Sequence, residues 1–280
     1  MQRLEIASEP IRTSLIEAGT GRPTLLVHGT SSSAETNWAA LLPGLAQRRR
    51  CLALDLAGSG ETRDDGAPLT LDALVGQVRD CMALAGDLPV DLVGYSLGGV
   101  VAATAAALMP ERVRRLVLFG AWARTDSRMR LLFTLWQSLA RSDRHQLARM
   151  VLLNGVSERF IACMDDATVE GMLRRFGASL APGSDRQAGL DAIIDITPLL
   201  PRIRAATLVI GMRHDQMVPP AHCQALAAAI SGASYAEIDS GHLVMLEQPE
   251  RLLALIEQHL DSATTSTSEH QANTLNRSQG

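Results

Sequence analysis

The sequence contains no lysine, because all 26 of its Lys and Arg positions are arginines. Chemistry that forms a Schiff base on a lysine amine is therefore excluded. Aromatic residues make up only 3% of the 280 residues, so Leu, Val, Ile, Ala and Met must fill the core. The four cysteines are too widely spaced for a metal-binding pair or a dense disulfide framework, and they are Cys51, Cys81, Cys163 and Cys223. We therefore expect reduced thiols, no metal site and no cofactor.

Long apolar runs are also missing. The sequence shows no signal-peptide pattern and no run that could span a bilayer, so we expect a cytoplasmic protein without a membrane span. The formal net charge of −4 argues against nucleic acid as a partner. The arginine clusters at 48–50 and at 112, 114 and 115 lack interleaved aromatics, and we expect them to form solvated faces. Residues 263–280 are rich in Ser, Thr, Asn and Gln, which predicts a disordered tail.

The most informative pattern is Gly94-Tyr95-Ser96-Leu97-Gly98, a G-x-S-x-G sequence between an apolar β-type run and an Ala-rich helical run. In this setting a sharp strand-to-helix turn exposes the serine hydroxyl to a histidine base and to backbone N–H groups. The glycines two positions before and after Ser96 leave room for that turn. The pattern predicts that Ser96 is a catalytic nucleophile; the alternative is a serine in an ordinary strand-to-helix turn.

An acid and a histidine follow Ser96 in the chain order that accompanies this type of turn. Asp215 comes just after an apolar β-type run, and His242 follows a second, shorter one. We predict that Asp215 orients His242, which accepts the proton of Ser96. Two alternatives stay open: Asp215 caps the helix expected to begin near Pro219, or the nearby Asp239 is the acid.

An early strand-like run ends at His28-Gly29-Thr30 and continues into a serine-rich stretch. A hydrolase needs two N–H donors directed at the developing oxyanion. We predict that the backbone N–H of Leu97, directly after the nucleophile, is one donor and that of Thr30 the other, with Ser31 as the alternative. Taken alone, His28-Gly29 is equally consistent with a strand end whose histidine bonds its own loop.

Apolar runs and helical patterns alternate along the chain, which predicts an α/β fold with a mostly parallel sheet. Strands are expected near residues 3–7, 11–18, 24–28, 51–55, 90–95, 113–119, 207–211 and 234–238. Between residues 123 and 196 the β-pattern disappears, and short helices are expected near 129–136, 147–153, 159–164 and 169–176. We therefore expect a core formed by 1–122 and 197–262, a helical lid at 123–196 and the tail at 263–280.

Several apolar side chains of this lid could line an acyl pocket. They are Leu132, Phe133, Trp136, Met150, Leu153, Met164, Met172 and Phe176. We expect most of them to pack the lid onto the core instead. The abundance of Leu and Met predicts a pocket that is apolar and adaptable.

The chain resembles the α/β-hydrolase superfamily. The resemblance covers nearly all of residues 10–262 and is carried by His28-Gly29, DLAGSG at 55–60, the GYSLGG turn, GMRHD around Asp215, and SGH at His242. It implies an eight-stranded sheet flanked by helices, with a lid inserted after the sixth strand. The stretch 55–60 lacks the proline and the histidine common in the family, which affects a structural loop more than the chemistry. The serine at the turn argues against the similar dehalogenase branch, which has an aspartate there.

These residues predict a serine hydrolase that cleaves a carboxylic ester, thioester or lactone through an acyl-enzyme. If the lid excludes water, an alcohol or amine would accept the acyl group, which would make the protein an acyltransferase or cyclising thioesterase. The resemblance also allows carbon–carbon bond hydrolases and lyases, since a fold does not fix the reaction. A non-catalytic binding protein is a third class, disfavoured by the complete Ser–His–Asp set. The expected partner is a small molecule with an apolar acyl group, and the oligomeric state is left open.

Overall fold

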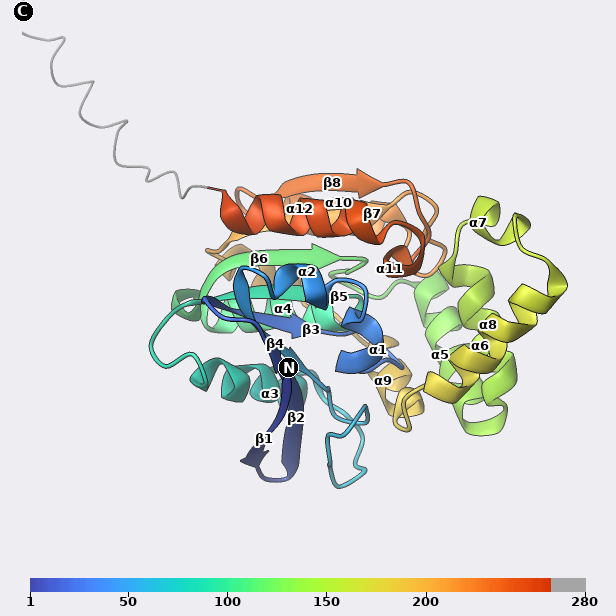
Figure 1. Ribbon diagram of the computed structural model, residues 1–280, viewed down its shortest axis with the longest axis horizontal. Helices are drawn as coiled ribbons and strands as arrows, with labels where there is room; N and C mark the ends of the chain where they lie inside the picture. The colour runs from blue at the N-terminus through green and yellow to red at the C-terminus, as the bar shows by residue number, and fades with distance from the viewer. Residues whose placement is uncertain (263–280) are drawn as a thin grey trace, which may run out of the picture.

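A central sheet of eight strands organises the protein in the computed structural model, which describes residues 1–262 (Figure 1). The strands are β1 (Gln2–Ser8), β2 (Ile11–Ala18), β3 (Arg22–Val27), β4 (Arg49–Leu54), β5 (Val90–Tyr95), β6 (Val113–Phe119), β7 (Ala206–Met212) and β8 (Ser234–Ile238). All eight expected strands are present, because most are short apolar runs bounded by turn residues, which bury well inside a sheet. The tail expected at 263–280 lies outside the described residues.

The strand order is β1-β2-β4-β3-β5-β6-β7-β8. β2 pairs antiparallel with both β1 and β4, whereas every other pair of neighbours is parallel. The expected mostly parallel sheet is therefore confirmed. Because parallel strands end at the same edge, the loops that follow β3, β5, β6, β7 and β8 emerge together, where open α/β sheets place their binding sites.

Helices cover both faces of the sheet. One face carries α3 (Leu71–Ala83), α4 (Leu97–Leu108) and α10 (Pro220–Ala229), and the other carries α1 (Ala34–Trp38), α2 (Leu42–Leu45) and α12 (Pro249–Asp261). Shorter elements are α11 (Val244–Glu247) and 3₁₀ turns at Pro110–Arg112 and Thr197–Arg202. Alternation along each strand separates the two cores: Leu25 and Val27 of β3 join one apolar cluster, and Leu26 joins the other.

Between β6 and β7 the chain forms a helical segment, residues 127–191, which we call the insertion. Its helices are α5 (Ser127–Ser142), α6 (Arg144–Gly155), α7 (Glu158–Ala162), α8 (Asp166–Ser179) and α9 (Ser184–Asp191). α5 packs against α9 and α6 against α8. Figure 1 shows the insertion beside the carboxyl ends of the parallel strands. The short α9 was not expected, because its sequence SDRQAGLD has little apolar periodicity.

Aspartates at the N-cap position determine where three helices of the insertion begin. Asp126, Asp143 and Asp165 directly precede α5, α6 and α8, and each carboxylate accepts a backbone N–H of the first turn. Such a cap satisfies donors that the helix itself cannot pair. These helices therefore begin two or three residues before the apolar patterns by which they were expected.

The expectation that the arginine clusters form solvated faces is wrong for Arg49 and Arg115, which are each 4% exposed. Arg49 forms an ion pair with Asp261 at the end of α12, and Arg115 donates to a backbone carbonyl just beyond it. Arg114 forms hydrogen bonds of 2.8 and 2.6 Å with the fully buried Asp91. Arg114 also donates to the carbonyl of Leu260 in α12 at 3.0 Å. All three arginines thus fasten α12 to the sheet through partners that local composition does not reveal.

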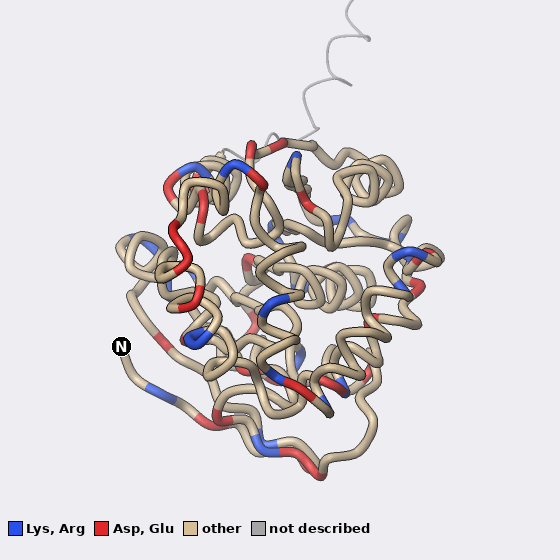
Figure 2. The backbone as a smooth tube through the Cα atoms, turned by 90° about the vertical axis from the view of Figure 1, so that its right-hand side faces the viewer, with Lys and Arg blue, Asp and Glu red and all other residues tan. Residues whose placement is uncertain are grey.

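Charged residues of both signs occur along the chain on the side of the insertion. In Figure 2, acidic and basic residues are interspersed over this face. Within residues 1–262, none of the helices has both the length and the apolar composition needed to cross a bilayer.

Candidate active site

Ser96 occupies a sharp turn between β5 and α4. Its backbone has φ 53° and ψ −123°, a conformation that residues other than glycine rarely adopt. A Cβ at Gly98 would lie 2.2 Å from the carbonyl oxygen of Val27, so glycine is required for α4 to begin this close to β3. Backbone strain of this kind concentrates at functional sites. The turn brings Ser96 to the carboxyl edge of the sheet.

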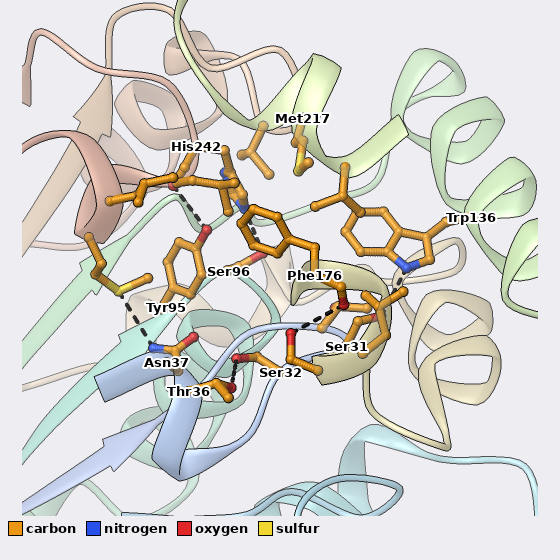
Figure 3. A pocket seen from close by; sticks show the side chains of 18 of the residues that line it. Ser31, Ser32, Thr36, Asn37, Tyr95, Ser96, Trp136, Phe176, Met217 and His242 are labelled. Atoms are coloured by element: carbon orange, nitrogen blue, oxygen red, sulfur yellow. Dashed lines mark hydrogen bonds between the residues drawn. The ribbon is translucent and has the colours of Figure 1, made fainter. Parts of the chain in front are cut away.

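Ser96, His242 and Asp215 form a continuous hydrogen-bonded chain. Nε2 of His242 lies 3.1 Å from Oγ of Ser96 (Figure 3), and Nδ1 lies 2.6 Å from Oδ2 of Asp215. All three residues are buried, at 7%, 4% and 4% exposure respectively. The other carboxylate oxygen of Asp215 accepts the N–H groups of Met217 and Val218, each at 2.8 Å, which fixes the carboxylate. The structure thus brings together the three side chains expected as nucleophile, base and acid.

Neither alternative for the acid matches the geometry. α10 begins at Pro220 without a side-chain cap, so Asp215 does not cap this helix. The carboxylate of Asp239 is half-exposed and lies 2.7 Å from Nε2 of His214 and 3.2 Å from a guanidinium nitrogen of Arg159. Asp239 therefore belongs to an exposed ion-paired cluster rather than to the imidazole of His242.

His28 has a structural position at the end of β3. Its Nδ1 lies 2.8 Å from the carbonyl oxygen of Gly29, and its Nε2 accepts the N–H of Leu56 at 2.9 Å. This arrangement requires the proton on Nδ1, and burial lowers the pKa of His28, which favours the neutral ring. The ring links its own loop to the loop at 55–60 and does not join the chain at Ser96.

Thr30 lies in the loop after β3, which runs directly against Ser96. A Cβ at Gly29 would lie 3.0 Å from the Cβ of Ser96. Within residues 1–262, the backbone N–H groups of Thr30 and Leu97 have no hydrogen-bond partner. The N–H of Ser31, in contrast, donates to the side chain of Gln187 at 2.8 Å. Both N–H groups of the expected pair are therefore free to donate, whereas that of the alternative, Ser31, is already occupied.

A cavity of about 270 Å³ opens beside Ser96 and His242 (Figure 3). The insertion contributes apolar lining side chains, which are Phe133, Trp136, Val151, Phe176 and Leu180. The loop after β3 and α1 contribute polar ones, which are Thr30, Ser31, Ser32, Thr36 and Asn37. In the described part of the chain the lining includes no Asp, Glu or Arg, so His242 is its one side chain able to carry positive charge. An uncharged molecule with an apolar part matches this lining.

The apolar side chains expected in the lid do not all take one of the two roles considered. Phe133, Trp136 and Phe176 line the cavity. Met150 is buried in the main core cluster, and Leu153 is 73% exposed. Position on the helix decides which side chains reach the cavity, since Phe133 and Trp136 of α5, Val151 of α6 and Phe176 of α8 line it and the residues adjacent to them in sequence do not.

The model of the alpha/beta hydrolase family matches residues 24–255, which is most of the chain. The chain belongs to the alpha/beta hydrolase family. This membership confirms the resemblance noted in the sequence, and it agrees with the sheet order and the flanking helices described above.

The relatives of this α/β hydrolase include proteins with different reactions. Pyrrolizixenacetamide deacetylase from Xenorhabdus hominickii is 38% identical over 244 residues, which cover 86% of this chain and 92% of that protein. 2-Hydroxy-6-oxo-2,4-heptadienoate hydrolase from Pseudomonas putida is 29% identical over 262 residues, covering 89% and 93%. Among solved structures, a thermophilic esterase from Thermogutta terrifontis superposes with a TM-score of 0.80 at 28% identity, covering 93% and 98%. The family is therefore one of hydrolases, and the reaction must be argued from the site.

Two side chains not singled out in the sequence hold His242 in this α/β hydrolase. The hydroxyl of Tyr95 donates to the carbonyl of His242 at 2.9 Å, and the two ring centroids are 5.0 Å apart. Glu247 accepts the N–H groups of Gly241 at 2.9 Å and Ser157 at 2.8 Å, which ties the His242 loop to the start of α7. Tyr95 was visible inside the G-x-S-x-G pattern, whereas no sequence signal connects Glu247 to residue 157.

Asp191 is a second buried acid near the Thr30 loop. It lies at the end of α9 and is fully buried, and its Oδ2 accepts the hydroxyl of Thr30 at 2.5 Å. Its Oδ1 has no hydrogen-bond partner within residues 1–262. Burial raises the pKa of Asp191 from 3.8 to about 8, against the smaller opposing effect of the Thr30 hydrogen bond. Asp191 is therefore mainly protonated at neutral pH.

We expect Asp191→Asn to remove a pH dependence of stability. The folded protein binds the Asp191 proton more tightly than the unfolded chain does, so the contribution of Asp191 to wild-type stability falls as pH rises from about 4 to about 8. Asparagine carries no charge at any of these pH values, so the Tm of the variant should rise relative to that of the wild type over this interval. Thermal unfolding followed by circular dichroism between pH 5 and pH 8 measures the difference. A difference in Tm that is independent of pH would contradict a raised pKa.

Proposed function

We propose that this α/β hydrolase is a serine hydrolase that cleaves an uncharged carboxylic ester, thioester or lactone. Ser96 is the nucleophile, His242 is the base and then the acid, and Asp215 orients the imidazole. The observation that supports this most strongly is the hydrogen-bonded chain from Ser96 to Asp215 beside a largely apolar cavity.

The reaction proceeds in two halves. In the first, Oγ of Ser96 bonds to the acyl carbon while its proton passes to Nε2 of His242. The carbonyl oxygen becomes an oxyanion that accepts hydrogen bonds from the N–H groups of Thr30 and Leu97, each worth about 3–4 kcal/mol in comparable sites. The intermediate then expels the alcohol, thiol or ring oxygen, which takes the proton from Nε2. In the second half, water attacks the acyl-enzyme in the same way and releases the carboxylic acid and Ser96.

The lining of the cavity favours a substrate without charge. A carboxylate moved into this cavity would lose its water without gaining a cation, which costs several kcal/mol. The Pseudomonas putida relative is named for a heptadienoate, which is a carboxylate. Within the described residues, no arginine lines the cavity to pair with such a group. We therefore favour cleavage of neutral acyl compounds over carbon–carbon bond hydrolysis of an anionic dienoate.

Deacetylation of an amide is a second candidate. The Xenorhabdus relative, 38% identical to this chain, is named an acetamide deacetylase. The same three side chains serve this reaction, with His242 protonating the departing amine. Transfer of the acyl group to an alcohol also shares the first half, and product analysis with added alcohols separates it from hydrolysis.

We further propose that the helical segment 123–196 acts as a lid on a core formed by 1–122 and 197–262. Phe133, Trp136 and Phe176 support this, since all three belong to helices of the insertion and form part of the apolar wall of the cavity. A wall of this kind limits the entry of water and gives the acyl group an apolar surface.

We expect p-nitrophenyl hexanoate to have a kcat/KM at least about 100-fold higher than the mono-p-nitrophenyl ester of adipic acid. The two acyl chains have the same length and differ by one terminal carboxylate, whose burial without a cation corresponds to about 3 kcal/mol or more. Release of p-nitrophenolate measures both rates.

A cation placed at the rim of the cavity provides the matched control. Ser179 is exposed on α8 and lines the cavity. The variant Ser179→Arg should therefore lower the ratio of kcat/KM for the hexanoate ester to kcat/KM for the adipate ester by about fivefold. Equal kcat/KM for both esters in the wild type would contradict a neutral substrate. A wild type inactive on esters, thioesters and N-acetyl amides would contradict serine hydrolysis itself.

A further inference from the structure

Ser31 is held in a left-handed conformation by three groups of the insertion. Its φ is 64°, and within residues 1–262 the one other non-glycine residue with positive φ is Ser96. The N–H of Ser31 donates to Oε1 of Gln187 at 2.8 Å, and its carbonyl accepts the N–H of Ala181 at 3.0 Å. Its hydroxyl accepts the indole N–H of Trp136 at 2.9 Å. Such a conformation persists only where the surrounding structure determines it, and here the insertion does so.

Gln187 joins this loop to a second one. Its side chain is fully buried, and its Nε2 donates to the carbonyl of Ala57 at 3.0 Å and to the hydroxyl of Ser59 at 2.9 Å. The orientation of the amide follows from its neighbours, because Ser31 offers an N–H and Ala57 a carbonyl. Gln187 therefore fixes the distance between the Thr30–Ser31 loop and the loop at 55–60.

Asp191 holds the adjacent residue of the same loop. It lies one helical turn after Gln187 on α9, so the two side chains project from one side of the helix. Asp191 accepts the hydroxyl of Thr30, while the backbone N–H of Thr30 has no partner within residues 1–262. The contacts thus fix the position of Thr30 without occupying its N–H.

We propose that Gln187 and Asp191 are positioning residues that hold the Thr30–Ser31 loop so that the Thr30 N–H stays directed at the oxyanion. The inference rests on the proposed serine hydrolysis and extends it by making the insertion a part of the oxyanion site. An oxyanion exists only after attack by Ser96, so a displaced N–H lowers kcat and leaves substrate binding nearly unchanged. If Gln187 and Asp191 served stability alone, their substitution would lower Tm and leave kcat unchanged.

The first test separates stability from activity at position 191. Asp191→Leu removes the acceptor for the Thr30 hydroxyl and, with it, a buried acid that has an unpartnered oxygen. We expect a Tm at pH 7 no lower than that of the wild type. On p-nitrophenyl acetate, kcat should fall about 10- to 100-fold with KM changed less than about twofold. Asp191→Asn keeps an acceptor oxygen and should recover most of the lost kcat.

The second test uses a matched pair of buried glutamines. Gln77 on α3 is 2% exposed and forms three hydrogen bonds, one of them with the N–H of Ala57, but it does not touch Ser31. Gln187→Met and Gln77→Met each remove three side-chain hydrogen bonds, one of them to the backbone of Ala57, so both should lower Tm. Only Gln187→Met should lower kcat, by about 10- to 100-fold.

The possible failures of these tests can be distinguished from one another. Equal kcat for the two methionine variants, or wild-type kcat in Asp191→Leu, would overturn the inference. If Gln187→Met does not fold, the kcat values of Asp191→Leu and Asp191→Asn still test the positioning role. A wild-type protein that hydrolyses no ester would count against the proposed function rather than against the positioning role.

Discussion

Ser96→Ala is expected to lower kcat on p-nitrophenyl butyrate by about 10⁴-fold or more and to abolish labelling by a fluorophosphonate probe. In the proposed mechanism, ester and probe both react with Oγ of Ser96, and His242, whose Nε2 lies 3.1 Å away, accepts the proton. Without that oxygen, only water can attack, at a site that is otherwise unchanged. Alanine retains the Cβ and with it the backbone strain, so Tm should stay close to that of the wild type. Steady-state kinetics and mass spectrometry of the labelled peptide measure the two effects.

Ser138→Ala is the control for this experiment. Ser138 lies on α5 outside the cavity lining, so its loss should change neither turnover nor labelling. Undiminished turnover in Ser96→Ala, or a probe attached to a different residue, would remove Ser96 from the mechanism. Loss of labelling together with a large fall in Tm would indicate misfolding instead, and circular dichroism distinguishes the two.

The sheet could be predicted from sequence because its signals are local. Most strands are runs of apolar residues between turns, and the alternation that divides Leu25 from Leu26 is a property of neighbouring residues. The helix α9 could not be predicted in this way, because its polar sequence SDRQAGLD has no apolar stripe. The prediction of a solvated Arg49 was wrong, because the partner that buries it, Asp261, is 212 residues away. The local amino-acid composition does not show whether a charged residue has a partner far away in the sequence.

In the candidate site, too, some residues could be predicted from the sequence and others could not. Ser96, Asp215 and His242 could be proposed because each follows a recognisable strand and their chain order is characteristic. Gln187 and Asp191 could not, since they meet Ser31 and Thr30 from 156 and 161 residues away and lie on a helix without a motif. The residues that surround the candidate site could therefore be identified only from the three-dimensional structure, whereas the proposed catalytic residues could be identified from the sequence.

The second large effect is expected from the acid, for which the chain offers a matched pair. Asp215 and Asp239 both follow a strand at the carboxyl edge, and each accepts a hydrogen bond from a histidine ring, at 2.6 and 2.7 Å. Only the ring next to Asp215 continues to Ser96. Replacing each aspartate by asparagine makes the same chemical change at two histidine–carboxylate pairs, of which one belongs to the proposed mechanism.

Asp215→Asn should lower kcat by about 10⁴-fold, whereas Asp239→Asn should keep most of the activity. The side-chain amide introduced by Asp215→Asn can still accept the N–H groups of Met217 and Val218 through its oxygen, which turns its NH₂ group toward Nδ1 of His242. Nδ1 must then accept a hydrogen bond, so the ring proton moves to Nε2, and Nε2 can no longer take the proton of Ser96. The fold is preserved by this change, so a normal Tm with lost kcat is the expected result. The reverse result, a large loss in Asp239→Asn alone, would assign the acid to the pair with His214 and overturn the proposed chain.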